Sequence, residues 1–189
     1  MSLRASLNGR RRAYTLIELV IVIALLGIAG ALLVPHMVDQ DNMLAQAAVR
    51  QLIGDLSFAQ SDALANQEFR RVHFYDDGSG YCIVRVTADN YAAAWDAGTA
   101  DYVEDPLAAS TEGGRYIMTY SESNRYQGVT ISDVDIDGGG SDLVYDFLGG
   151  TVRGGDLPGT GGTIEISSGD DQYEITVAPF TGKLTVREL

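Results

Sequence analysis

The feature that most constrains this chain is an apolar run near its N-terminus. Residues 19 to 34 contain no polar side chain, and residues 14 to 17 extend the run upstream with a single interruption at Glu18. A helix of this length can span the hydrocarbon core of a bilayer. We therefore predict a single transmembrane helix over residues 14–35.

The charges on either side of this run predict its orientation. Four arginines fall in the first thirteen residues, whereas Asp39 and Asp41 follow the run. Because positive charge is retained on the cytoplasmic side, the N-terminus is expected in the cytoplasm and residues from about 36 onward outside it. The bulk of the chain is then extracytoplasmic.

Glu18 is the one ionisable side chain inside the run. A carboxylate within an apolar membrane helix costs about 2.5 to 3.5 kcal/mol on insertion scales, so such residues are usually kept for a function. The pattern predicts that Glu18 has a partner of opposite charge. The alternative is a tolerated glutamate at the interface of a plain membrane anchor.

The string from Arg12 to Val22, Arg-Ala-Tyr-Thr-Leu-Ile-Glu-Leu-Val-Ile-Val, closely resembles the class III signal of type IV pilins and type II secretion pseudopilins. The resemblance implies that prepilin peptidase removes a basic leader, residues 1–13, by cutting between Ala13 and Tyr14. Tyr14 would become the N-methylated N-terminus. Family members usually carry Gly and Phe at the positions of Ala13 and Tyr14.

The resemblance also implies an assembly role for Glu18, the fifth residue of the processed chain. Cleavage makes a free amine on Tyr14 whose pKa is about 8, so it is largely cationic at neutral pH. The Glu18 carboxylate of one subunit can then pair with the Tyr14 amine of a neighbour and set the axial register between helices. Pro35 falls where the family has a proline that kinks the helix.

A second helical pattern follows the membrane segment over residues 36–66. Its apolar residues recur at alternating spacings of four and three and predict one buried stripe: Ala45, Val49, Leu52, Leu56, Ala59 and Ala63. Polar residues, with Asp55 among them, are assigned to the opposite face. Together the two halves predict one helix from residue 14 to about 66.

From Phe69 the hydrophobic period changes to two, which predicts an extracytoplasmic β domain over residues 67–189. The strand candidates are 69–75, 80–86, 115–120, 128–132, 142–148, 162–167, 172–178 and 183–187. Residues 87–114 are interpreted as a variable loop whose Trp95 folds onto the sheet. The predicted fold class is α+β, with the amphipathic half-helix packed on an antiparallel sheet, as in pilins.

Parts of the β domain resemble the GspH/FimT branch of the same superfamily. The matching segments are Leu52–Phe74, Tyr145–Gly150, Thr163–Ile166 and Val177–Leu184. The resemblance implies a minor subunit of a filament. Its implied partners are other pilins or pseudopilins, prepilin peptidase and the assembly platform of the bacterial inner membrane.

One acidic segment carries a possible metal site. Asp133, Asp135, Asp137 and Asp142 around a triple glycine match the opening of a calcium loop, in which carboxylates wrap a hard cation. The EF-hand twelfth position is Val144 instead of Glu, and the alternation with apolar residues also fits an ordinary strand. Calcium is therefore the one candidate cofactor, and no cofactor is the other reading.

No motif for catalysis is present, and the single cysteine, Cys82, is read as a small buried hydrophobe, so we expect no enzyme. Beyond residue 13 the chain carries nine basic against 26 acidic side chains, which disfavours nucleic acid.

The leading functional hypothesis is a minor pseudopilin of a type II secretion system, assembled into a periplasmic pseudopilus for protein export. The first alternative is a minor pilin of a type IV pilus, serving adhesion, motility or DNA uptake. The second alternative, from another class, is an anchored binding or sensor domain, which predicts no processing at Ala13 and no need for Glu18.

Overall fold

The computed structural model describes residues 15–105, 114–121, 123 and 125–189, with the backbone alone for residues 31–41. It divides into two compact units, residues 1–39 and 40–189. Helix α1 (Leu16–Asn66) runs through both units. The strands are β1 (Phe69–Phe74), β2 (Gly80–Val86), β3 (Asp101–Tyr102), β4 (Ile117–Thr119), β5 (Val129–Ile136), β6 (Asp142–Tyr145), β7 (Thr151–Arg153), β8 (Leu157–Pro158), β9 (Gly162–Ser168), β10 (Asp171–Val177) and β11 (Leu184–Glu188).

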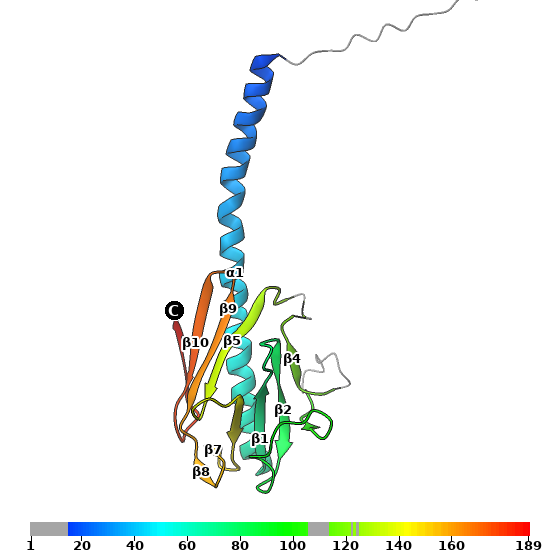
Figure 1. Cartoon of the computed structure of the whole chain (residues 1–189), viewed down its shortest axis with the longest axis vertical. Helices are drawn as coiled ribbons and strands as arrows, with labels where there is room; N and C mark the ends of the chain where they lie inside the picture. Colours follow the sequence, from blue (N-terminus) through cyan, green and yellow to red (C-terminus); the bar gives the residue numbers. More distant parts are fainter. Residues whose placement is uncertain (1–14, 106–113, 122, 124) are drawn as a thin grey trace, which may run out of the picture. The chain divides into compact units, whose positions relative to one another are not determined.

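The second unit contains two antiparallel sheets and the C-terminal half of α1 (Figure 1). The first sheet has the order β3-β2-β1-β6-β7-β8, with β4 also pairing with β2, and the second has the order β11-β10-β9-β5. This arrangement confirms the predicted α+β class. The sequence indicated one sheet, and the structure divides the strands between two.

Strands β1 and β2 form a hairpin, and strands β9, β10 and β11 form a C-terminal meander. In the hairpin, the Tyr75 N–H donates to the Gly80 carbonyl at 3.0 Å, and Gly78 adopts a φ of 70°. This left-handed conformation favours glycine because a side chain would crowd the backbone. Strands β9, β10 and β11 pair in chain order.

Some strand bounds differ from the prediction for local reasons. Strand β6 ends at Tyr145 instead of 148, because the Asp146 side chain accepts from the Leu148 and Gly150 N–H groups and forms a turn. Strand β5 extends beyond residue 132 to Ile136 and so includes part of the candidate calcium segment. Strands β3, β7 and β8 were not predicted, since two or three residues are too few to show a period.

The segment between β2 and β3 folds onto the face of the first sheet that points away from α1. Trp95 stacks on His73 of β1, with ring centroids 4.1 Å apart and planes at 14°, and Tyr91 stacks on Phe69 at 5.3 Å. Cys82 is buried and forms no disulfide. The predictions made for Trp95 and Cys82 are confirmed.

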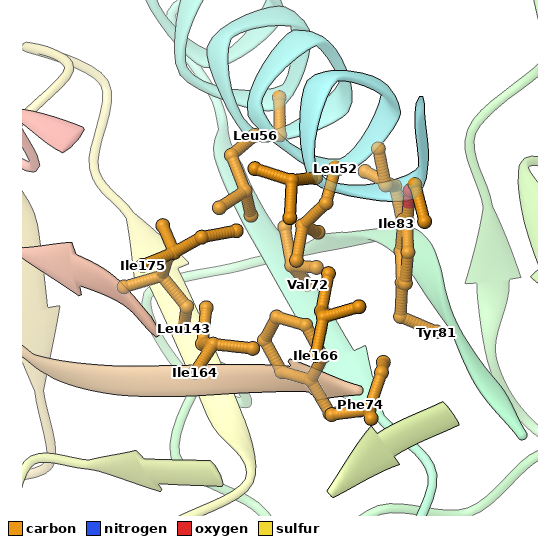
Figure 2. Close-up of a cluster of buried hydrophobic side chains, with 14 of the residues drawn as sticks. Leu52, Leu56, Val72, Phe74, Tyr81, Ile83, Leu143, Ile164, Ile166 and Ile175 are labelled. Atoms are coloured by element: carbon orange, nitrogen blue, oxygen red, sulfur yellow. The ribbon is translucent and has the colours of Figure 1, made fainter. Parts of the chain in front are cut away.

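The apolar stripe of α1 forms the centre of one core shared by both sheets. All six predicted stripe residues are buried, and all of them except Val49, which is 5% exposed, have no exposed surface. Figure 2 shows Leu52 and Leu56 pointing toward Val72 of the first sheet and Ile164 and Ile175 of the second. The predicted helix–sheet packing is confirmed.

The prediction that Asp55 lies on the polar face of this helix, opposite the buried stripe, is wrong. Its side chain is buried, with 4% of its surface exposed. Tyr116 and Gln51 donate to its Oδ1 at 2.8 Å each, and Tyr81 donates to its Oδ2. Burial raises the pKa of Asp55 above 3.8, although the three hydrogen bonds oppose the shift.

The raised pKa makes stability depend on pH with a defined sign. Because the folded pKa lies above the unfolded one, the contribution of Asp55 is fully present below pH 3.8 and is lost as pH rises through the raised folded value. Asp55→Asn should therefore gain stability relative to the wild-type chain as pH rises across that window. Denaturant unfolding of the full chain in detergent, repeated from acidic to neutral pH, measures the difference.

Asp77→Asn provides a control of opposite sign. Hydrogen bonds from Ser79 lower the pKa of Asp77, so its contribution is present above pH 3.8 and is lost as pH falls. A pH-independent difference for Asp55→Asn would contradict the raised pKa.

Candidate assembly site at the start of the helix

Thr15 and Glu18 form the start of α1. The Glu18 N–H donates to the Thr15 carbonyl at 3.1 Å and to Thr15 Oγ1 at 3.3 Å, and the Leu19 N–H donates to the Thr15 carbonyl at 3.2 Å. Thr15 is therefore the N-cap and Glu18 the third helical residue, as in a capping box. The cap was missed by the sequence analysis, although the spacing Thr-x-x-Glu is its signal.

The position of Glu18 suits a negative charge. It lies in the first turn, where unpaired backbone N–H groups and the helix dipole favour an anion. The structure thus confirms that Glu18 is in the first turn. Its pairing with an amine in another subunit stays a prediction.

The helix around Glu18 exposes an apolar surface on all sides. Every residue from 15 to 30 is exposed, with Leu16 at 82% and Leu26 at 66%. A surface of this size and composition marks contact with lipid or with other proteins. Residues 15–30 do not have the one-sided hydrophobic stripe seen at residues 45–63, so this part of the helix is suited to burial on every side.

Among the residues that the structure describes, no helix is both long and apolar enough to cross a membrane.

Three other predicted positions in this region have no described side chain. Ala13 and Tyr14, the cleavage and methylation sites, lie outside the described residues. Residue 35 is helical, so α1 continues through Pro35. Cleavage, methylation and the kink at Pro35 stay predictions.

The structure gives the aspartates of the candidate calcium site separate partners. Asp135 accepts from the Gly139 N–H at 2.6 Å, and Asp137 accepts from the Thr160 N–H at 2.6 Å. The first bond closes a local turn, which is an ordinary role of aspartate, whereas the second joins two segments 23 residues apart in the chain.

Asp142 takes part in a third, distinct contact, because its Oδ1 lies 2.7 Å from His73 Nδ1. Asp133 lies on β5 and is exposed. Within the described ranges, no three or more His, Cys, Asp or Glu side chains are grouped to hold a metal ion. Calcium binding stays a prediction.

The comparison with protein families identifies the N-terminal segment. Residues 8–34 match the family described as "Prokaryotic N-terminal methylation motif". The match spans Ala13, Tyr14 and Glu18, and it confirms the resemblance to the signal of type IV pilins and pseudopilins. The chain thus carries the N-terminal signal of type IV pilin-like proteins.

No curated protein matches this chain. Among solved structures it is similar to the minor pseudopilin EpsH from the Type 2 Secretion System of Vibrio cholerae, with 15% identity and a TM-score of 0.48 over 77% of this chain and 95% of that chain. A likeness this weak establishes neither the fold nor the function of this chain.

The N-cap generates a prediction for Thr15. Thr15→Val removes the hydroxyl at nearly constant shape and should destabilise the first helical turn by about 1 kcal/mol. Hydrogen exchange of the Glu18 amide, measured by NMR on the full chain in detergent micelles, should accelerate accordingly. Thr15→Asn retains a capping acceptor and should exchange like the wild-type chain; equal acceleration in both variants would contradict the capping role.

Proposed function

We propose that this protein is a minor pseudopilin of a type II secretion system, in the GspH/FimT branch, and that its role is structural. The observation that carries the proposal is the methylation motif at the head of a helix whose residues from 15 to 30 are all exposed and include one acid, Glu18. An enzyme needs a defined site, whereas a filament subunit needs such a helix.

The proposed assembly follows from the chemistry of the helix start. Removal of residues 1–13 leaves a cationic amine on Tyr14, and Glu18 of an incoming subunit neutralises it. Both charges are costly in an apolar environment, so the pair forms only where the two helices are in one axial register. The exposed apolar residues around Glu18 then pack against other helices and exclude water.

The location and partners follow from the same proposal. Before assembly the chain is anchored in the bacterial inner membrane by residues 14–35, with its leader in the cytoplasm and its β domain in the periplasm. Prepilin peptidase processes it, and the inner-membrane assembly platform inserts it among other pseudopilins. A type IV pilus would use the same helix, so the subunits that accompany this chain distinguish the two systems.

The first prediction of this proposal is cleavage of the chain between Ala13 and Tyr14. The membrane-extracted chain should begin at Tyr14, carry one added methyl group, and depend on prepilin peptidase for both changes. Intact-mass and N-terminal analysis of protein from cells with and without the peptidase measures this. An unprocessed chain beginning at Met1 in both strains would replace the filament proposal with an anchored binding domain.

The second prediction of this proposal is that assembly needs the negative charge of Glu18. Glu18→Gln should be processed normally but should lose crosslinks to neighbouring subunits, because glutamine cannot neutralise the Tyr14 amine. Glutamine at this position still fits a capping box, so the helix start is retained. Crosslinking in membranes, followed by mass spectrometry of the linked partners, measures the loss. The identity of the partners shows whether the chain belongs to a secretion system or to a pilus.

Glu188→Gln is the matched control, since Glu188 is exposed on β11. It removes one charge from the acidic domain and should leave the crosslinks unchanged. Normal crosslinking of Glu18→Gln would contradict the pairing.

A further inference from the structure

Exposed apolar side chains gather at the end of the second unit where α1 ends. Gln60 of α1 donates to the carbonyls of Gly149 at 2.6 Å and Thr181 at 2.8 Å, so the turn after β6 and the turn after β10 meet at one amide group. Leu148 and Phe180 directly precede these two carbonyl residues and are 72% and 63% exposed. The two turns therefore bring two exposed apolar residues close together.

Leu64 and Leu157 extend this apolar surface, and each is about half exposed. Leu64 follows Gln60 by one helical turn and lies on the same face of α1. Leu157 of β8 stands two residues before Gly159, whose carbonyl accepts from the Phe180 N–H at 3.3 Å. Figure 1 shows β7 and β8 at the end of the domain where α1 ends.

The surface holds most of the exposed apolar residues of the β domain. Beyond residue 40, eight large apolar side chains are exposed among the described residues, and five of them belong to this surface. A group of this kind marks contact with another molecule. We call these five residues the end patch: Leu64, Phe147, Leu148, Leu157 and Phe180.

The backbone of Phe180 has a conformation that favours smaller residues. Its φ is 62°, in the left-handed region that a bulky side chain seldom adopts. The Phe180 carbonyl accepts from the Thr151 N–H at 3.0 Å, so the fold holds this turn through its backbone. Asparagine or glycine would adopt the turn with less strain, and the phenylalanine ring is mostly exposed. Folding alone therefore does not account for phenylalanine at this position.

Two basic side chains without a partner flank the end patch. Of the nine basic residues beyond residue 13, seven contact an acidic, polar or aromatic side chain. Within the described ranges, the charged groups of Arg153 and Lys183 make no such contact, and both residues are exposed. Arg153 lies opposite Leu157 in the β7–β8 pair, and Lys183 follows Phe180 by three residues.

We propose that the end patch docks an apolar segment of another protein that carries carboxylates on its flanks. The apolar side chains of the segment cover Leu148 and Phe180 and supply most of the affinity, and its carboxylates pair with Arg153 and Lys183 and fix its orientation. An anionic membrane would also meet these two cations. The chain beyond residue 13 has nine basic against 26 acidic side chains, however, so such a membrane repels the domain as a whole. The inference goes beyond the proposed structural role and does not depend on it.

Two peptides of equal apolar content test the proposal. The first is acetyl-Asp-Leu-Leu-Phe-Leu-Asp-amide, and the second has lysine in place of both aspartates. Each is labelled with a fluorophore and titrated with the full chain in phosphatidylcholine nanodiscs, and empty nanodiscs give the blank. The acidic peptide should bind saturably above the blank and about tenfold more tightly than the basic one, because only its charges complement the flanks. Equal binding, or no binding above the blank, would overturn the proposal.

Phe180→Asn tests the apolar part of the end patch. Asparagine tolerates the left-handed backbone but lacks the ring, so the variant should bind the acidic peptide about tenfold more weakly while its denaturant midpoint rises. Leu189→Asn is the matched control, since Leu189 is exposed but lies outside the end patch, and it should bind as the wild-type chain does. Equal binding by the two variants would overturn the proposal. Leu148→Ser makes the same test at a more exposed position if Phe180→Asn is unstable.

Lys183→Glu tests the charged flank. The variant should weaken binding of the acidic peptide and tighten binding of the basic one, so the preference between the peptides falls by at least about fivefold. Arg50→Glu makes the same charge change at an exposed position of α1 and should leave the preference unchanged. Equal preferences in the two variants would overturn pairing at the flank.

Vesicles distinguish a protein partner from a membrane. The nanodisc-bound chain should sediment no more with phosphatidylglycerol vesicles than with phosphatidylcholine vesicles. Sedimentation with phosphatidylglycerol that Phe180→Asn and Lys183→Glu both abolish would overturn the proposal and assign the end patch to a membrane surface.

Discussion

The β domain depends on the burial of one stripe of α1 against two sheets at once. Leu52 and Leu56 contribute to a core that contains Ile83 of the first sheet and Ile164 and Ile175 of the second. Full burial of a leucine or isoleucine is worth about 1.5–3 kcal/mol, so a stripe of this length outweighs any single hydrogen bond in the domain.

Polar contacts then set the position of the helix along and around that stripe. Gln60 donates to the carbonyls of Gly149 and Thr181, which tie α1 to a turn of each sheet. Asn42, about five turns earlier on α1, donates to Asp171. Apolar burial is not directional, so these bonds select one register of helix on sheet among several that bury similar area. Asp55 belongs to the same set, because its hydrogen bonds with Tyr81 and Tyr116 form in one position only.

Sequence patterns were sufficient where the physical cause is local or periodic. The spacing of the apolar residues predicted the buried stripe and the strands β1 and β2. The position of Glu18 near the start of the apolar run placed this acid near the start of the helix. Sequence patterns were insufficient where the cause is tertiary. The burial of Asp55 requires donors from strands far along the chain, and the approach of Leu148 to Phe180 requires a turn from each sheet. No spacing rule predicts either, because the fold selects which residues meet.

The N-terminal site shows the same division between local and assembled structure. Within one chain, the helix dipole stabilises an acid at the position of Glu18 by about 0.3–1 kcal/mol, whereas a carboxylate in an apolar helix costs about 2.5–3.5 kcal/mol. The cap at Thr15 satisfies a backbone donor and does not change the charge of Glu18. A deficit therefore remains in the isolated subunit, and no described cation lies on this part of the helix to remove it. A cation from a second chain can remove it, which is why the position of this acid favours assembly over a plain anchor.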